Sequence, residues 1–288
     1  GLEAEETVAY EIRESDAGSA ALVDGVELEE SAPGKLRINV GGTHFTTYNY
    51  GADVVRPYLY PVMAEPGVGV TRNWPMIDGV AGETNDHPHH KGIYTAQDQI
   101  NGVNNWGENE GHGWIIQKEF TRLYSGPVAG GFTAELEWTD VDKVANMTET
   151  RRITFYNTPT GERVFDWDVT LHASEGEVTI GDTKEGGLLT ARVASSMDAG
   201  NENGGWIENG VGGKQEPETW GKRAPWCDYS GPVGEGWYGI ALMDHPDNPR
   251  HPTFWHVRNY GLMGANCFGH SDFVGNPEDR WDFVIPAG

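Results

Sequence analysis

The stretch RVFDWDVTLHA, residues 163–173, is the clearest indication of the fold in this sequence. Apolar and polar side chains alternate along it almost without a break. The apolar set is Val164, Phe165, Trp167, Val169 and Leu171, and the polar set is Asp166, Asp168 and Thr170. A period of two is typical of a β-strand that buries one face and leaves the other in solvent.

Short segments of the same kind recur along the chain, each with β-branched or aromatic residues and flanking turn residues. They are TVAYEIRE (7–14), KLRINV (35–40), FTAELEWTD (132–140), RRITFYN (151–157), GEVTIGD (176–182), LLTARVASS (188–196), YGIALMDH (238–245) and FWHVRNYG (254–261). Helical periodicity is hard to find. We therefore expect a large antiparallel β-sandwich that forms one all-β domain over residues 1–288.

Two glycine-rich and polar stretches, 74–114 and 197–222, are expected to be long loops that build a cleft on this scaffold. A chain of 288 residues can bury a large core without disulfides. Cys227 and Cys267 are therefore expected to be small buried side chains, or at most one bridge.

The net charge of −24 argues against nucleic acid and against an anionic membrane surface as partners, since both attract basic proteins. No run approaches the ~20 apolar residues of a membrane helix. The chain starts at Gly1 without a signal-peptide pattern, as a mature exported chain would, so a periplasmic or extracellular location is expected.

The segment NDHPHHKGIY, residues 85–94, holds three of the ten histidines. In an extended segment, His87 and His89 share one face and His90 lies opposite. Of the three, His90 is therefore the one for which a structural role is most expected. His87 and His89 would suit as two ligands of a divalent metal ion, with Glu108 or His112 as a third ligand. Alternatively, one of the two would act as a general base and the other would orient it. A simple structural role is the alternative, and composition does not decide between these.

Two further segments place cationic and phenolic side chains on alternate positions. Arg56, Tyr58 and Tyr60 form one such face, and His256, Arg258 and Tyr260 form the other. If the two faces meet across one pocket, they suit a carboxylate or a sugar, because Arg offers a planar fork and Tyr a ring with a hydroxyl. A buried Arg–carboxylate pair is the alternative for Arg56.

Other polar and aromatic residues, in the glycine-rich stretches, in segments 181–197 and 243–269 and at position 226, are candidates for contacts with a sugar. This group comprises Asn105, Trp106, Glu108, Glu185, Arg192, Trp226 and His245.

Four stretches together resemble a bacterial PmoA-like family, labelled "methane oxygenase PmoA" or simply a domain of unknown function. They are RPYLYPVMAEPGVGVTRNWPM, DHPHHKGIYTAQDQINGVNNWGE, DTKEGGLLTARVASSM and HPTFWHVRNYGLMGANCFG, within residues 40–285. The label does not suit a chain without a membrane span. The resemblance implies a soluble β-sandwich, similar to galactose mutarotase, that is associated with polysaccharide degradation in marine and gut bacteria, including that of ulvan. Relatives continue with a further strand beyond the point where this sequence stops at Gly288.

Pattern and resemblance together favour a lyase or dehydratase that performs β-elimination on an acidic, uronic-acid-containing oligosaccharide such as an ulvan fragment. His87, His89 or His90 is the expected base, and Tyr260 or Tyr60 the acid. Arg56, Arg192 and Arg258 would neutralise the carboxylate. No cofactor is required, although a divalent metal ion on His87 and His89 is an alternative.

Two other functions remain open. A glycoside hydrolase acting on a plant or algal oligosaccharide needs two carboxylates across one pocket, for which Glu108 and Glu185 are the best pair. A non-catalytic glycan-binding module would use the tryptophans alone. The sequence gives no indication of the oligomeric state.

Overall fold

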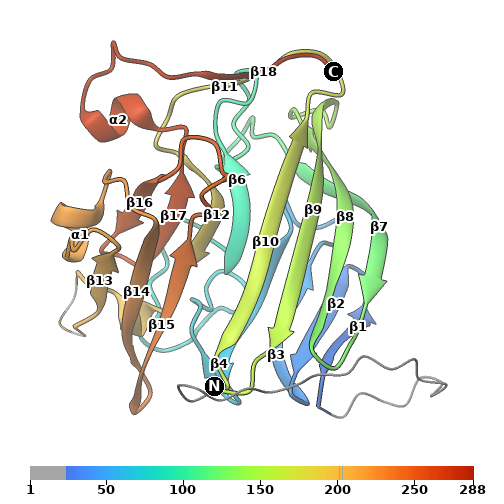
Figure 1. The fold of residues 1–288 in the computed structure, drawn as a ribbon, viewed down its shortest axis with the longest axis vertical. Helices are drawn as coiled ribbons and strands as arrows, with labels where there is room; N and C mark the ends of the chain where they lie inside the picture. Colours follow the sequence, from blue (N-terminus) through green and yellow to red (C-terminus); the bar gives the residue numbers. More distant parts are fainter. Residues whose placement is uncertain (1–23, 201, 203) are drawn as a thin grey trace, which may run out of the picture.

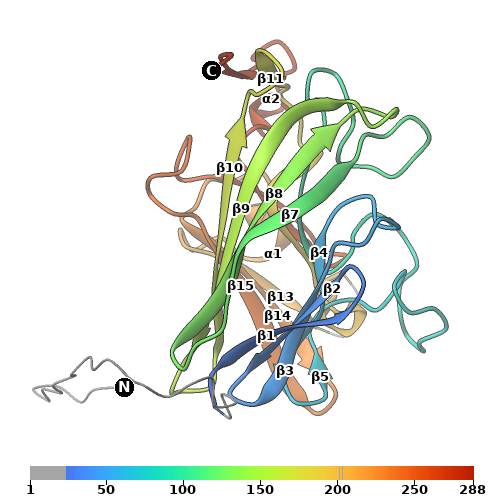
Figure 2. The same ribbon diagram turned by 90° about the vertical axis from the view of Figure 1, so that its right-hand side faces the viewer.

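The computed structural model describes residues 24–200, 202 and 204–288, and these form an all-β sandwich (Figure 1). The strand expected at 7–14 lies outside the described residues. Two antiparallel sheets make up the two main layers, which Figure 2 shows from the side with strands β7 to β10 in one layer and β1 to β3 in the other.

The larger sheet has nine strands, of which eight follow one another in the order β1-β2-β3-β4-β6-β12-β17-β16, and β5 pairs with β4. Their bounds are β1 Val26–Ala32, β2 Lys35–Val40, β3 Thr43–Asn49, β4 Tyr58–Glu65, β5 Val68–Gly69, β6 Ile93–Gln97, β12 Gly186–Arg192, β17 Leu262–Asn266 and β16 Phe254–Arg258. Neighbours in this sheet come from distant parts of the chain, so residues near 60, 90, 190 and 260 meet at its centre.

The second sheet has the order β10-β9-β8-β7, with bounds β7 Ile115–Tyr124, β8 Ala129–Thr139, β9 Ala145–Asn157 and β10 Arg163–His172. In β10, every second residue from Phe165 to Leu171 is partly buried and its neighbours are exposed, which confirms the alternation expected there. Val164 is an apolar residue at one of the outward-facing positions of β10, and 45 % of its surface is exposed.

Smaller elements complete the fold. A three-stranded sheet contains β13 Trp206–Asn209, β14 Trp226–Val233 and β15 Gly236–Met243, and a two-stranded sheet pairs β11 Val178–Ile180 with β18 Phe283–Ile285. The helical turns are η1 Ser195–Met197, α1 Gln215–Thr219 and α2 His270–Val274. The longest described helices have five residues, so none has the length that crossing a bilayer requires.

The two stretches expected to be loops are partly regular. The 74–114 stretch contains β6, and the 197–222 stretch contains β13 and α1. All five residues of β6 are buried, so the strand shows no alternation of apolar and polar side chains from which to recognise it.

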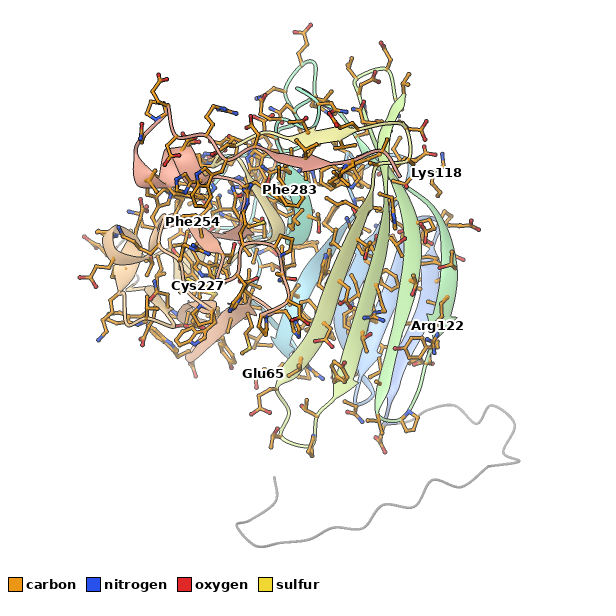
Figure 3. All side chains as sticks on the ribbon, turned by 45° about the horizontal axis from the view of Figure 1, so that its top comes forward. Glu65, Lys118, Arg122, Cys227, Phe254 and Phe283 are labelled. Carbon is orange, nitrogen blue, oxygen red and sulfur yellow. The ribbon has the colours of Figure 1, made fainter. Side chains whose placement is uncertain are left out.

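Apolar side chains from both sheets meet in one core. Phe45 of β3 packs edge-on against Phe155 of β9, with ring centroids 6.0 Å apart. Trp167 of β10 donates from Nε1 to Thr95 Oγ1 of β6 over 3.0 Å, which ties the layers together by a polar contact. Cys227 (Figure 3) and Cys267 are both buried and free.

An ion pair lies inside this core. Arg151 donates from Nε to Glu149 Oε1 over 2.6 Å, and Trp138 Nε1 donates to Glu149 Oε2 over 2.6 Å. The side chains of Arg151 and Glu149 are both fully buried. Each of these two buried charges is compensated only while its partner is present, because removing one partner leaves the other charge unpaired in a low-dielectric interior.

We expect Arg151→Met to lower the free energy of unfolding by about 3–5 kcal/mol, because it leaves Glu149 charged and buried without its cation. Arg152→Met is the matched control, since Arg152 is 61 % exposed and its ion pair with Asp168 is on the outer face. The control should cost about 1 kcal/mol or less. Urea unfolding of the two variants measures both values, and equal losses would contradict the assignment.

Candidate functional site

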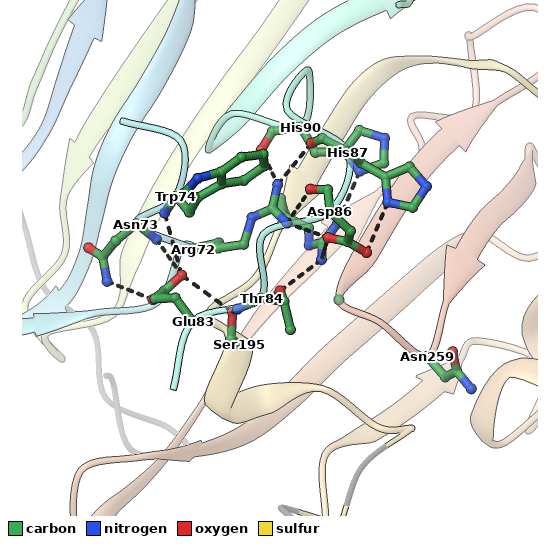
Figure 4. Close-up of polar contacts among 12 residues, drawn as sticks. Arg72, Asn73, Trp74, Glu83, Thr84, Asp86, His87, His90, Ser195 and Asn259 are labelled. Carbon is green, nitrogen blue, oxygen red and sulfur yellow. Dashed lines mark hydrogen bonds and ion pairs between the residues drawn. The ribbon is translucent and has the colours of Figure 1, made fainter. Parts of the chain in front are cut away.

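The carboxylate of Asp86 is bound by two buried arginines (Figure 4). Arg72 NH1 donates to Asp86 Oδ1 over 2.5 Å and Arg192 NH2 donates to the same oxygen over 2.8 Å, and both guanidinium groups are fully buried. Burial works against ionisation of Asp86, but Arg192 and the hydrogen bond with His87 lower its pKa. Asp86 is therefore a fixed anion at neutral pH.

Arg72 also holds the backbone of the histidine segment, since its NH2 donates to the carbonyl oxygens of His87 and His90 over 2.9 and 3.2 Å. Burial, together with the nearby charge of Arg192, lowers the pKa of Arg72 to about 10, and Asp86 opposes this effect. Arg72 stays charged at neutral pH and fixes the histidine segment to the large sheet.

Residues 87–90 form a tight turn rather than an extended segment. The amide of His90 donates to the carbonyl oxygen of His87 over 3.0 Å, and His87 adopts the left-handed conformation with φ at 46°. The turn stacks the His87 and His90 rings in parallel, with centroids 4.8 Å apart and 1° between their planes. His89 lies edge-on to both rings, 77° from each plane.

The prediction that His87 and His89 share one face, with His90 opposite, is therefore wrong, since it is the ring of His90 that stacks on that of His87. The reason is that the turn replaces the period of two on which the expectation rested. His89 instead packs edge-on against Trp106, with centroids 5.9 Å apart, and burial together with Arg56 lowers its pKa to about 3.

The protonation of the two stacked histidines follows from their partners. His87 Nδ1 lies 2.9 Å from Asp86 Oδ2, so it carries the proton and donates it, which leaves Nε2 with a free lone pair. Arg192 NH1 lies 3.1 Å from His90 Nδ1, and because a guanidinium only donates, His90 Nδ1 accepts and Nε2–H is the donor. Burial keeps the pKa of His90 well below its ordinary value, so the ring is neutral.

Tyr260 completes this stack. Its ring lies 4.8 Å from that of His87 at 10°, and the guanidinium carbons of Arg192 and Arg258 lie 5.0 and 5.5 Å from its centroid. Burial raises the pKa of Tyr260, although the two arginines oppose the shift. The phenol is therefore protonated at neutral pH.

These side chains open onto a cavity of about 230 Å³. It is lined by His87, His90, Lys184, Glu185, His256, Arg258, Tyr260 and Leu262. Lys184 and Arg258 bring positive charge to it, and each has an acidic neighbour: Lys184 Nζ contacts Glu185, and Arg258 Nε lies 3.1 Å from Glu216 Oε1. Two cationic side chains at one cavity, in a chain with a net charge of −24, are groups that can bind an anionic ligand.

His256 forms part of the cavity wall. It is 2 % exposed and its ring stacks on Trp106 with centroids 6.2 Å apart. Burial, with Lys184 and Arg258 nearby, lowers the pKa of His256 to about 3, so it lines the cavity as a neutral ring. The face expected to contain His256, Arg258 and Tyr260 does reach one cavity.

The face expected to contain Arg56, Tyr58 and Tyr60 does not reach the cavity, which corrects that expectation. Arg56 is buried, and it donates to the carbonyl oxygens of His89, Trp106 and Gly107 as well as to Glu108. Its two terminal nitrogens are therefore used within the protein. Tyr58 and Tyr60 belong to a buried aromatic cluster under the site, and the Tyr60 hydroxyl donates to Asn73 over 2.8 Å.

Glu108 has two cationic neighbours, with Arg56 NH1 at 3.3 Å and Lys91 Nζ at 2.6 Å, and it does not line the cavity. Asn105 is buried and donates to the carbonyl oxygens of Trp114 and Thr139, while Trp106 is 3 % exposed and supports the His90 and His256 rings from below. These three residues stabilise the site rather than line it.

Trp226 and His245 also lie outside the cavity. Trp226 belongs to β14 of the three-stranded sheet, and His245 follows β15 with 70 % of its side chain exposed. Three important residues were missed as site candidates: Arg72, Asp86 and Lys184. Asp86 and Lys184 each adjoin a recognised candidate in sequence, whereas Arg72 carries no signal that distinguishes it from any other arginine.

No group of three His, Cys, Asp or Glu side chains in the described parts of the chain is arranged to hold a metal ion. His87 donates from Nδ1 to Asp86, which leaves Nε2 as the nitrogen that a metal ion would use. A metal ion on His87 and His89 stays a prediction.

The chain is thus a β-sandwich protein with a polar cavity against strands β16 and β17 of its larger sheet. The chain belongs to the family of unknown function DUF6807, which matches residues 35–288. Neither a curated protein nor a solved structure matches the chain. The likeness to PmoA-like and galactose-mutarotase-like proteins stays a prediction.

Asp198 gives the site region a distinctive dependence of stability on pH. It is 4 % exposed and its Oδ1 has no hydrogen-bond partner among the described residues. Burial raises its pKa from 3.8 to about 6, an effect that Arg192 opposes. Because the folded state binds this proton more tightly than the unfolded state, the group destabilises the fold as pH rises between these two values.

We expect Asp198→Asn to be more stable than the wild type above about pH 6, with the difference shrinking as pH falls toward 4. Urea unfolding across this range measures the effect. Asp247→Asn is the control, since the Asp247 side chain is 93 % exposed and should give no such pH dependence. A difference that is constant with pH would show that Asp198 does not titrate in this range.

Proposed function

We propose that this protein is a lyase that performs β-elimination on uronic-acid-containing oligosaccharides. The observation that carries the proposal is the Asp86–His87 pair, which leaves His87 Nε2 as a base at a cavity lined by Lys184, Arg258 and Tyr260. A neutral imidazole oriented by a carboxylate abstracts protons efficiently near neutral pH.

The substrate carboxylate would bind on the positive side of the cavity. Lys184 and Arg258 supply charge, and the Nε2–H of His90 supplies a directed donor. Such groups stabilise most strongly the enolate that develops when the proton beside the carboxylate leaves. Arg192 would act behind them, because its donors are bound to Asp86, His90 and Thr84.

The reaction balances with two protein groups. His87 Nε2 takes the C5 proton, a double bond forms between C4 and C5, and the bond from C4 to its oxygen breaks. Tyr260, protonated at neutral pH, gives its proton to the departing oxygen. The His87 and Tyr260 rings are stacked 4.8 Å apart, so acid and base act from the same side of the sugar, which suits a syn elimination.

Hydrolysis has less support, because Glu185 lines the cavity and Glu108 does not. Two carboxylates across one pocket are the requirement of that chemistry. A uronic-acid lyase would act where such glycans are degraded, so the proposal includes a periplasmic or extracellular location and fragments of marine glycans, such as ulvan, as substrates.

Incubation with uronic oligosaccharides should raise the ultraviolet absorbance as the conjugated double bond forms. His87→Gln should lower kcat by about 10²–10⁴-fold, since it removes the base. His245→Gln is the matched control, because His245 is exposed and outside the cavity, and it should keep full activity. No absorbance change across a broad panel of uronic oligosaccharides would refute the proposal.

Tyr260→Phe should lower kcat with little change in KM, since the ring and its stacking on His87 remain while the proton donor is lost. The loss should be smaller for substrates with a better leaving group, because these need less protonation of the departing oxygen. An equal loss for all leaving groups would assign Tyr260 to positioning rather than to proton transfer.

A further inference from the structure

The three-stranded sheet has three tryptophans on one face, of which Trp206 and Trp237 are exposed and Trp226 is half-buried. Directly opposed residues in antiparallel strands point to the same side, so the register defines this face. Trp206 lies opposite Ser230, Trp226 opposite Met243, and Trp237 opposite Pro232. We call it the tryptophan face; it comprises Trp206, Glu208, Trp226, Asp228, Ser230, Pro232, Trp237, Gly239, Ala241 and Met243.

This face is open to solvent, whereas the opposite face of the same sheet is core. Trp237 is 58 % exposed and Met243 78 %, while Ile207, Cys227 and Tyr229 on the other side are fully buried. Large rings on the solvent-facing side add only the small stabilisation of cross-strand pairs and leave much apolar surface in water. Exposed apolar patches of this kind mark binding surfaces.

The spacing of the rings suits an extended ligand. Trp226 and the position opposite Trp237 are six residues apart along β14, which corresponds to about 20 Å. Trp206 lies beside the same strand between these two points. Gly239 and Ala241 on β15 are small, so the surface between the rings is low and the rings stand above it.

The polar groups of this face are mostly acceptors. Trp206 donates from Nε1 to Glu208 Oε2 over 3.1 Å, and the Asp228 carboxylate lies over Gly239, where a Cβ would come within 3.2 Å of its Oδ1. Lys214 approaches from the edge, 5.7 Å from the Trp206 ring. Among the residues that define the face, charge comes only from Glu208 and Asp228, so it repels polyanions and a second copy of this acidic chain.

We propose that the tryptophan face binds an extended neutral glycan. Sugar rings stack their C–H faces on tryptophan, and their hydroxyl groups donate to the two carboxylates. None of these residues lines the cavity, so this is a second binding surface, independent of the proposed elimination.

Titration of the full chain with neutral β-linked hexasaccharides of glucose and of xylose, followed by calorimetry, tests the proposal. We expect binding to at least one of them, with Trp237→Ala weakening it about tenfold or more. His87→Gln should bind as the wild type does, because the cavity is not involved. Trp237→Ala should leave the binding of an oligogalacturonate of equal length unchanged, because the two carboxylates of this face repel it and any binding would be at the cavity.

Trp281→Ala is the matched control, since Trp281 is also an exposed tryptophan, at 39 %, but precedes β18. It should leave the affinity unchanged. The proposal is overturned if no neutral hexasaccharide binds, or if Trp281→Ala and Trp237→Ala weaken binding equally. Self-association that Trp237→Ala abolishes, without any glycan binding, would instead assign the face to contact between copies.

Discussion

The contact between Asp86 and the buried guanidinium groups of Arg72 and Arg192 is the interaction on which the site depends. The two arginines come from separate segments, and their like charges lie close together in the interior. Asp86 offsets that repulsion, and through Nδ1 of His87 it also sets which nitrogen of that ring is basic. One carboxylate therefore stabilises the fold locally and determines the chemistry available at the cavity.

Cationic side chains gather around the cavity of a protein whose net charge is −24. Lys184 and Arg258 lie at the surface of the cavity, whereas Arg56, Arg72 and Arg192 are buried behind it with their donors bound to protein oxygens and to His90. The buried arginines still contribute their charge, since a guanidinium does not deprotonate in proteins. Neutral histidines in front of them can then be donors or bases without adding further charge.

The fold was largely predictable because β-strands that bury one face leave a period of two in the sequence. β10 and β2 follow that rule, and both lie where the pattern places them. β6 does not follow it, since it is buried on both faces, and no alternation reveals it. Its position between β4 and β12 is what brings the histidine segment to the middle of the sheet, so the strand most important for the site was the least visible one.

The site was predictable only in part. Its residue types can be recognised within short stretches of sequence, whereas its geometry depends on contacts between distant segments. Three histidines in four positions, followed far along the chain by Arg258 and Tyr260, indicated the right residue types. Which histidines face the cavity depends on the left-handed backbone of His87 and on carbonyl contacts with Arg72, and neither leaves a period in the sequence. Arg56 shows the converse: a residue type suited to ligand binding was taken up by backbone oxygens, because the terminal nitrogens of this buried guanidinium find their acceptors in the surrounding protein.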